Sequence, residues 1–176
     1  MQPGPFSRRP LRVRYWNAEA RVVDAERLTL ESHLRRLGDV TVTSATTLED
    51  AYSATPDLII VAAPRMDETA FPTWLAGIRK RMQALHGIWT PVVVLADVGF
   101  EVLADQILVA SADNWYVDVV SPAHVSSLPI RIANLLRIHD HLHEMHRYAT
   151  AVSEVSGKVQ TLEAEVERLR RSKPSP

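Results

Sequence analysis

The sequence predicts a doubly wound α/β fold, in which one parallel sheet is covered by helices on both faces. Two observations support this prediction. Five strand-like segments alternate with helix-like segments between residues 11 and 137, and the segments at 58–63 and 91–95 are apolar almost throughout. Apolar runs of this kind are typical of parallel strands that are buried on both faces. Alternation of strands and helices is typical of a parallel sheet with helical crossovers.

The elements in the first half of this domain follow from local patterns. Apolar residues alternating with Arg12 and Arg14 predict the first strand. Because a central strand is normally apolar on both faces, the two arginines also predict a sheet face that is partly open or has a displaced helix. Gly38 is placed to end the first helix, and Thr47 is expected to cap a short second helix. The expected elements are strands at 11–15 and 40–43, a helix at 22–37 and a short helix after Thr47.

The second half of the domain repeats the alternation. A stripe of apolar residues that includes Leu75 and Met82 predicts the third helix, and Pro129 stands at a favourable first-turn position for the last one. The expected elements are strands at 58–63, 91–95 and 115–120 and helices at 74–85, at 100–110 and from about residue 129 onward. Together these elements predict a flavodoxin-like (βα)5 arrangement with strand order 2-1-3-4-5.

Composition restricts the class of protein. With 176 residues and 46% hydrophobic content, the chain accommodates one globular domain and an appendage. A formal charge of −1 argues against bulk attraction to nucleic acid or membrane. The chain has no cysteine, which excludes disulfides and thiolate chemistry. No apolar run approaches the ~20 residues of a membrane span, and residues 1–5 lack the apolar core of a secretory signal. We therefore expect a cytoplasmic protein that does not associate with membranes.

Several short segments occur in a characteristic order. They are Pro-Asp-Leu-Ile-Ile-Val at 56–61, Thr-Pro-Val-Val-Val-Leu at 90–95, Ser-Ala-Asp-Asn-Trp-Tyr at 111–116, Ser-Pro at 121–122 and Ile-Arg-Ile-Ala-Asn-Leu-Leu-Arg at 130–137. Through them, residues 10 to about 137 resemble the receiver domains of bacterial two-component response regulators. The resemblance implies the same flavodoxin-like fold and identifies the positions at which the family carries out phosphoryl transfer.

At those positions the chain lacks the family's chemistry. The family uses two metal-binding acids after the first strand, an acceptor aspartate, a hydroxyl residue and a lysine; the matching positions here are Trp16, Asn17, Ala62, Ala96 and Ser121. A Mg²⁺ ion requires carboxylate oxygens, and phosphoryl transfer requires neutralisation of charge at the transferred group. Asp97 follows Ala96 but lies on the wrong strand to accept phosphate in the family's geometry. The resemblance therefore implies a pseudo-receiver. Trp16 is most simply a core or rim residue, and the alternative is that it caps the site.

From Ile138 onward, apolar residues repeat with a period of seven. β-Branched residues at position a and leucine at position d favour a parallel two-stranded coiled coil. In that register Lys158 faces Glu163 of a second chain, Glu165 faces its Arg170, and both pairs attract. The alternative is an amphipathic helix folded back on its own domain, but the stripe is narrow and the domain already has five helices. This apolar seam consists of Ile138, Met145, Tyr148, Val152, Val155, Val159, Leu162, Val166 and Leu169.

Histidines are concentrated near the start of the same helix. His139, His143 and His146 share one helical face, where zinc or nickel binding is chemically possible. A solvated face is the simpler interpretation, since the pattern offers no further ligands, and no metal site is predicted. His141 occupies a d position, where protonation would place two charges across a dimer and make this part of the helix sensitive to pH.

The functional prediction is a non-catalytic, phosphorylation-independent pseudo-receiver that acts as a dimeric adaptor or regulator in bacterial signalling. Receivers bind partners through the face formed by their fourth helix, fifth strand and fifth helix. By that resemblance the partner-binding residues here are Gln106, Asn114, Tyr116 and Asp118. No cofactor or catalytic residue is expected, because the chain has no phosphate-cradling glycine loop and no recognisable catalytic constellation. The expected segments are a flexible arm at 1–10, the pseudo-receiver domain at 11–137, the coiled-coil extension at 138–171 and a disordered tail at 172–176.

Two other functions stay open. Some antiterminators that bind RNA join a pseudo-receiver to a coiled coil and a small helical RNA-binding domain, and this chain shows only the first two parts. Nucleic-acid binding is therefore not the favoured prediction. The second alternative is a small-molecule sensor, because this fold class binds ligands at the carboxyl ends of its strands. Its pocket would be lined by Asn17, Ala62, Ala96 and Ser121.

Overall fold

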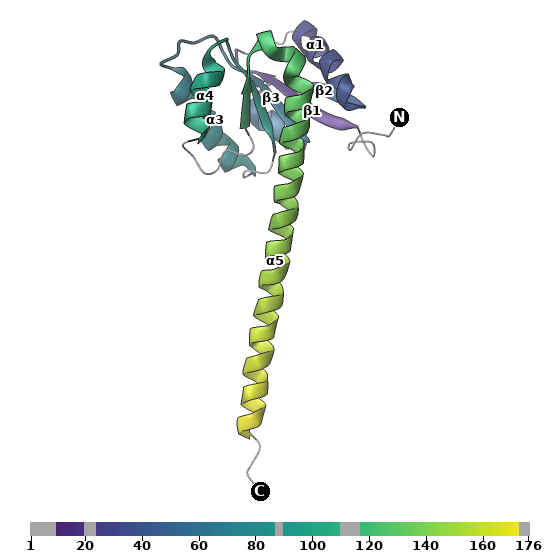
Figure 1. Cartoon of the computed structure of the whole chain (residues 1–176), viewed down its shortest axis with the longest axis vertical. Helices are drawn as coiled ribbons and strands as arrows, with labels where there is room; N and C mark the ends of the chain where they lie inside the picture. The colour runs from purple at the N-terminus through teal and green to yellow at the C-terminus, as the bar shows by residue number, and fades with distance from the viewer. Residues whose placement is uncertain (1–9, 20–23, 87–89, 110–116, 173–176) are drawn as a thin grey trace. The chain divides into compact units, whose positions relative to one another are not determined.

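The computed structural model, which describes residues 10–19, 24–86, 90–109 and 117–172, confirms the predicted flavodoxin-like α/β fold. Five parallel strands pair in the order β2-β1-β3-β4-β5, and Figure 1 labels β1, β2 and β3 of this sheet. The strands are β1 (Leu11–Asn17), β2 (Val40–Ala45), β3 (Leu58–Ala62), β4 (Val92–Leu95) and β5 (Val117–Val120). The helices are α1 (Asp24–Leu34), α2 (Leu48–Ser53), α3 (Phe71–His86), α4 (Phe100–Val109) and α5 (Leu128–Ser172), with 3₁₀ turns η1 (Arg35–Leu37) and η2 (Pro122–Ser127). Apart from Pro10 and Ser172, the expected flexible arm and disordered tail lie outside the described residues.

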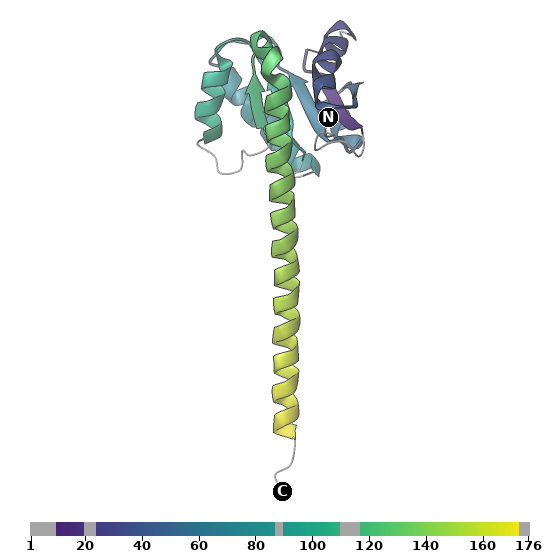
Figure 2. The same ribbon diagram turned by 45° about the vertical axis from the view of Figure 1, so that its right-hand side comes forward.

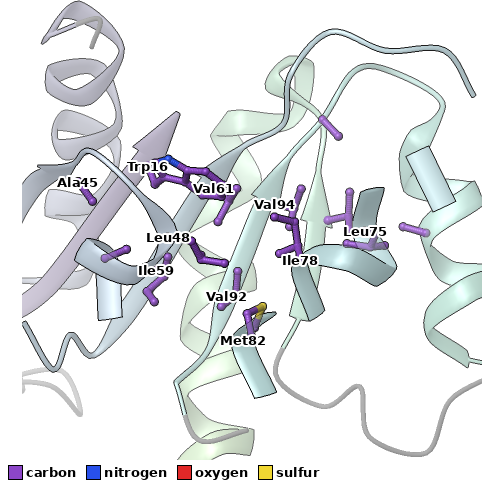
Figure 3. Packing of buried hydrophobic residues seen from close by; sticks show 14 of the residues in the cluster. Trp16, Ala45, Leu48, Ile59, Val61, Leu75, Ile78, Met82, Val92 and Val94 are labelled. Carbon is purple, nitrogen blue, oxygen red and sulfur yellow. The ribbon is translucent and has the colours of Figure 1, made fainter. Parts of the chain in front are cut away.

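The sheet separates two apolar cores. Ile59 and Val61 of β3 point into a core formed with α2, α3 and α4, which Figure 3 shows from close by. Leu58 and Ile60 point to the opposite face, into a core formed with α1 and the start of α5. Since successive residues of a strand point to opposite faces, a strand between two cores must be apolar at every position. This is the physical reason why the apolar run at 58–63 predicts a central strand.

The third helix begins earlier than its apolar stripe predicts. The stripe predicts a start at Trp74, whereas α3 starts at Phe71. Phe71 is fully buried and its ring stacks on that of Phe100, with the centroids 4.6 Å apart. Just before the helix, the Asp67 carboxylate accepts a hydrogen bond of 2.8 Å from the backbone N–H of Ala70. A hydrogen-bond acceptor at its start and the buried ring of Phe71 therefore stabilise the extra turn. The apolar periodicity reveals neither of them.

The two arginines of β1 lie on the sheet face that carries α2. Arg14 donates to the Asp50 carboxylate at 2.7 Å and to the Thr43 hydroxyl at 3.2 Å. Arg12 pairs with Asp57 at 3.5 Å and its side chain is 50% exposed. Because α2 has only six residues, it does not cover the whole of this face. The face is partly open at Arg12 and is closed at Arg14 by a polar layer. Of the two arrangements predicted from the sequence, a partly open face or a displaced helix, the structure shows the partly open face.

Arginine side chains occupy both edges of the sheet. Arg27 of α1 donates to the backbone carbonyl of Val42 on the edge strand β2 at 3.1 Å. Arg131 of α5 donates to the backbone carbonyl of Val119 on the other edge strand, β5, at 3.0 Å. Exposed strand edges are templates for pairing with another chain, and charged side chains on an edge oppose it. Recognition by strand addition is therefore disfavoured at these positions.

The chain divides into two compact units, residues 1–139 and 140–176, and α5 belongs to both. Figure 2 shows α5 as one uninterrupted helix, coloured from green to yellow. Its first turns contribute Leu128, Ile132, Leu135 and Leu136 to the core shared with α1. In the described parts of the chain, no helix has both the length and the apolar character needed to cross a membrane.

Candidate functional site

A cavity of about 1020 Å³ lies at the carboxyl ends of β1, β3 and β4. Its apolar lining includes Ala62, Ala63, Leu95 and Ala96 at the strand ends, together with Leu30 of α1 and Val125 of η2. Its polar lining consists of Tyr15, Asn17, Glu19, Glu26, Thr29, Arg65 and Asp97. We call this the strand-end cavity. Parallel strands end at the same edge of the sheet, so the ends of β3 and β4 meet there. Their small side chains, Ala62, Ala63 and Ala96, leave space for the cavity.

Three of the five positions matched to phosphoryl transfer line this cavity: Asn17, Ala62 and Ala96. The pairing of β1 with β3 places Asn17 directly beside Ala62. Ala96 is almost fully buried, and its backbone N–H donates to the carbonyl of Val120 at 3.1 Å. The side chain at position 62 is a methyl group, so it offers neither an oxygen to accept phosphate nor a ligand for a metal ion.

Trp16 does not line the strand-end cavity, so the structure contradicts the alternative that it caps the site and agrees with the prediction of a core residue. It pairs with Val61 of β3 and packs in the core on the α2, α3 and α4 face of the sheet, as Figure 3 shows. The reason is the alternation of a strand. Tyr15 and Asn17 point toward the cavity side, and Trp16 between them must point to the other side.

Ser121 is fully buried but is likewise not among the residues that line the cavity. It is the N-cap of η2, and its hydroxyl accepts a hydrogen bond of 3.2 Å from the backbone N–H of Ala123. Its own backbone N–H donates to the Glu101 carboxylate at 2.6 Å. The small hydroxyl residue thus has a structural role at the junction of β5 and η2.

A chain of hydrogen bonds runs along one wall of the strand-end cavity. The Tyr15 hydroxyl donates to Glu26 at 2.7 Å, and the Asn17 amide donates to the same oxygen at 3.5 Å. The Asn17 side-chain oxygen accepts from the backbone N–H of Glu19 at 2.9 Å, and Glu19 accepts from the backbone N–H of Arg65 at 2.7 Å. Burial, and then the neighbouring Glu26 carboxylate, raise the pKa of the Tyr15 phenol above its ordinary value. The phenol therefore stays protonated and holds Glu26 in place.

Sequence reasoning did not identify Tyr15, Glu19, Glu26 or Arg65 as site residues, because it considered only the family's five positions. Their positions did carry a signal. Glu19 lies two residues after β1, Arg65 lies three residues after β3, and Glu26 lies in the first turn of α1. Segments that follow the carboxyl ends of parallel strands meet at one edge of the sheet, where this fold class binds ligands. A search for charged residues just beyond the strand ends would have found Glu19 and Arg65.

The carboxylates of the strand-end cavity do not form a metal centre. Within the described ranges, no three histidine or acidic side chains are arranged to hold one metal ion. This includes Glu19, Glu26 and Asp97, which line the same cavity. The three carboxylates therefore do not converge on a single point.

A second polar cluster connects α4, β5 and the start of α5. Arg131 binds the Asp118 carboxylate at 2.5 Å and 2.8 Å and approaches Glu101 at 3.5 Å. Glu101 also binds the His124 ring at 3.0 Å. Burial alone would raise the pKa of the Glu101 carboxyl. The hydrogen bond from the Ser121 N–H, with His124 and Arg131, holds that pKa below its ordinary value. The cluster fastens the three elements to one another.

Of the four predicted partner-binding residues, only Asp118 has a described side chain. Asn114 and Tyr116 lie outside the described residues, and so does the side chain of Gln106 on α4. Asp118 is partly buried and bound to Arg131, so it contributes to the surface as half of an ion pair. Both α4 and α5 also carry exposed apolar side chains: Val102 of α4 is 66% exposed and Ile130 of α5 is 65% exposed.

The residues of the apolar seam project from α5 into solvent. Their exposed fractions run from 42% at Ile138 to 72% at Tyr148. Along this helix Glu165 pairs with Arg168 at 2.6 Å and Glu167 with Arg171 at 3.2 Å. Nine large apolar side chains in a single stripe are far more than the scattered exposed residues of an ordinary surface.

No protein-family model matches this sequence, and a search of curated proteins gave no significant match. The functional proposal therefore depends on the fold, the strand-end cavity and the apolar seam.

Proposed function

We propose that this protein is a non-catalytic pseudo-receiver that dimerises through α5 and acts as an adaptor or regulator in a bacterial signalling pathway. The observation that carries the proposal is the exposed apolar seam. An apolar stripe of this length must be covered to be stable in water, and a second copy of the same helix covers it with matching side chains. The resemblance to receiver domains supplies the signalling context.

Charged residues beside the seam support a parallel pair. Lys158 at position g lies opposite position e of a parallel partner, which is Glu163, and Glu165 lies opposite Arg170. Both contacts join opposite charges. Exposed pairs of this type contribute little energy, about 0.2–1 kcal/mol each. Their main effect is to select the register and direction of the two helices, while the apolar seam provides the affinity.

The strand ends support independence from phosphorylation. The position that would carry the acceptor holds Ala62, and Asn17 beside it offers an amide in place of a carboxylate. Phosphoryl transfer relies on a metal ion and cationic groups to neutralise charge on the transferred group. The strand-end cavity instead presents three carboxylates, which would repel a phosphoryl donor.

Partner recognition is proposed for the surface formed by α4, β5 and the start of α5. The exposed Val102 of α4 and Ile130 of α5 offer apolar contact, and the Asp118–Arg131 ion pair offers polar contact. Arginines on both edge strands disfavour strand addition, so the partner is expected to bind to side chains. A net charge of −1 gives no general attraction to RNA, which argues against the antiterminator alternative.

The adaptor proposal is tested by affinity capture from the native host with full-length protein as bait. The wild type is compared with Val102→Asp/Ile130→Asp, which alters the proposed partner surface, and with Val159→Glu/Leu162→Glu, which alters the seam. Loss of the same protein partner in the surface variant supports the proposal. If the surface variant retains every partner, or if RNA is captured in a salt-dependent manner, the proposed adaptor surface is wrong.

Phosphorylation independence has a separate test. The protein is incubated with acetyl phosphate and Mg²⁺, and its intact mass is measured beside that of a functional receiver domain as the positive control. We expect no mass increase in this protein, because Ala62 has no oxygen to phosphorylate. An added phosphoryl group on this protein would contradict the proposal.

A further inference from the structure

We propose that the strand-end cavity binds a small organic cation that carries ammonium groups on a short methylene chain, such as a linear diamine or a basic amino acid. The proposal goes beyond the adaptor function and does not depend on it, because the cavity lies entirely within residues 15–125 and uses no residue of the apolar seam. It would make the domain responsive to a soluble metabolite.

Charge is the first argument for this ligand class. Among the described residues that line the cavity, Glu19, Glu26 and Asp97 are acidic, and Arg65 is the one base. An anionic ligand such as a phosphate or nucleotide would meet a net negative lining. A cation would be attracted to this lining.

The distribution of these charges selects an organic cation over a metal ion. A Ca²⁺ or Mg²⁺ ion needs several oxygen ligands converging at one point. The described side chains of this cavity provide no such group of three, although three carboxylates line it. Carboxylates that do not all converge on one point suit a ligand whose charges are separate, as they are at the two ends of a diamine.

The apolar lining and the volume fit such a ligand. Ala62, Ala63 and Leu95 form an apolar surface between the charged groups, which suits a methylene chain. The cavity, at about 1020 Å³, is at the upper end of the 300–1,000 Å³ typical of small-molecule sites. Its position is also that expected for a ligand in this fold, because β1 and β3 are the strands between which the chain order reverses.

Part of the polar wall is already fixed without a ligand. Glu26 is held by the buried Tyr15 hydroxyl and by Asn17, and Glu19 is held by the backbone N–H of Arg65. Side chains that are already ordered lose less conformational entropy when a ligand binds. Arg65 stands on the same rim and would bind the carboxylate of a basic amino acid, a group that a diamine lacks.

The test is isothermal titration calorimetry on the full-length protein. The ligands are 1,4-diaminobutane, ornithine, the uncharged analogue 1,4-butanediol, inorganic phosphate and MgCl₂, all at constant ionic strength. We expect saturable binding of 1,4-diaminobutane or ornithine and at least tenfold weaker binding of the other three. Tighter binding of ornithine would identify basic amino acids as the source of the ammonium group, and tighter binding of 1,4-diaminobutane would identify polyamines. Absence of saturable binding for both amines, or equal binding of 1,4-butanediol, overturns the proposal.

Variants locate the site. Glu19→Gln/Asp97→Asn removes two cavity carboxylates, and the control Asp39→Asn/Glu68→Gln removes the same charge from exposed positions that do not line the cavity. We expect the first variant to weaken amine binding at least tenfold and the control to leave it within twofold. Ala62→Leu, which fills the cavity from the strand end, is expected to abolish binding. Equal losses in the cavity variant and the control would show a diffuse charge effect and refute a site here.

Discussion

We propose that two copies pair through the apolar seam, so substitution of the seam should convert a dimer to a monomer. The perturbation is Val159→Glu/Leu162→Glu, which places one charge at position a and one at position d. In a parallel pair each new carboxylate faces its counterpart on the second helix. The variant therefore removes apolar contacts and adds repulsion at the centre of the seam, and both effects oppose pairing.

The magnitude follows from the exposure of these side chains. Val159 is 46% exposed and Leu162 is 64% exposed. Fully burying a valine or leucine contributes about 1.5–3 kcal/mol, so covering the exposed half contributes about 1 kcal/mol. A dimer contains four such side chains, which together contribute about 4 kcal/mol, or roughly a thousandfold in the dimer dissociation constant. Repulsion between the new carboxylates increases this loss.

The measurement is molar mass by sedimentation equilibrium at several protein concentrations. The control is Gln160→Glu/Ala164→Glu, which adds acidic residues in the same stretch at positions b and f, away from the seam. Wild type and control should fit a dimer, and the seam variant should fit a monomer. A monomeric wild type, or a seam variant with unchanged dimer mass, would refute pairing through the seam.

Two further predictions concern the folded domain. Thr47→Ala should lower the free energy of unfolding, measured by urea denaturation, by about 1 kcal/mol. The reason is that the Thr47 hydroxyl accepts a hydrogen bond of 3.0 Å from the Asp50 backbone N–H at the start of α2. Thr47→Ser should retain stability, and an unchanged urea midpoint for Thr47→Ala would contradict this N-cap role. The Glu101 pKa is lowered from its ordinary value of 4.5, so the carboxylate contributes stability that is fully present above about pH 4.5 and is lost as the pH falls through the lower folded-state value. Glu101→Gln should therefore reduce the loss of stability below pH 4.5 in urea titrations at several pH values, and identical pH profiles for variant and wild type would show that Glu101 does not contribute.

The fold could be predicted from the sequence because each strand has a local signature. The apolar runs of β3 and β4 identify strands covered on both faces, and their order along the chain determines a doubly wound sheet. The first and last residues of the helices and strands are harder to predict from the sequence. The start of α3 depends on the stacking of Phe71 on Phe100, residues that are far apart in the sequence and meet only in the folded core. The partly open face at Arg12 was one of two predicted arrangements, and the short length of α2 decides between them.

The candidate site could be predicted only in part. Comparison with receiver domains located Asn17, Ala62 and Ala96, which do line one cavity. It said nothing about Glu19, Glu26 or Arg65, because these residues have no counterpart among the five positions compared. It also left two predictions for Trp16, a core residue and a cap on the site, since a match by position along the chain carries no information about which face of the strand a side chain occupies.

The two apolar faces of α5 are distinct, which bears on the alternative of a helix folded back on its domain. The residues buried in the domain core are Leu128, Ile132, Leu135 and Leu136. In the heptad that starts at Ile138 they fall at positions b, e and f, whereas the seam occupies a and d. At 3.6 residues per turn these are different sides of the helix. Beyond Leu136 the core-facing side carries no comparable run of large apolar residues. A folded-back helix would need that side to continue apolar, so the seam is better suited to a second helix. It follows that Val159→Glu/Leu162→Glu should leave the urea unfolding of the domain unchanged, once protein concentration is taken into account, while it abolishes the dimer.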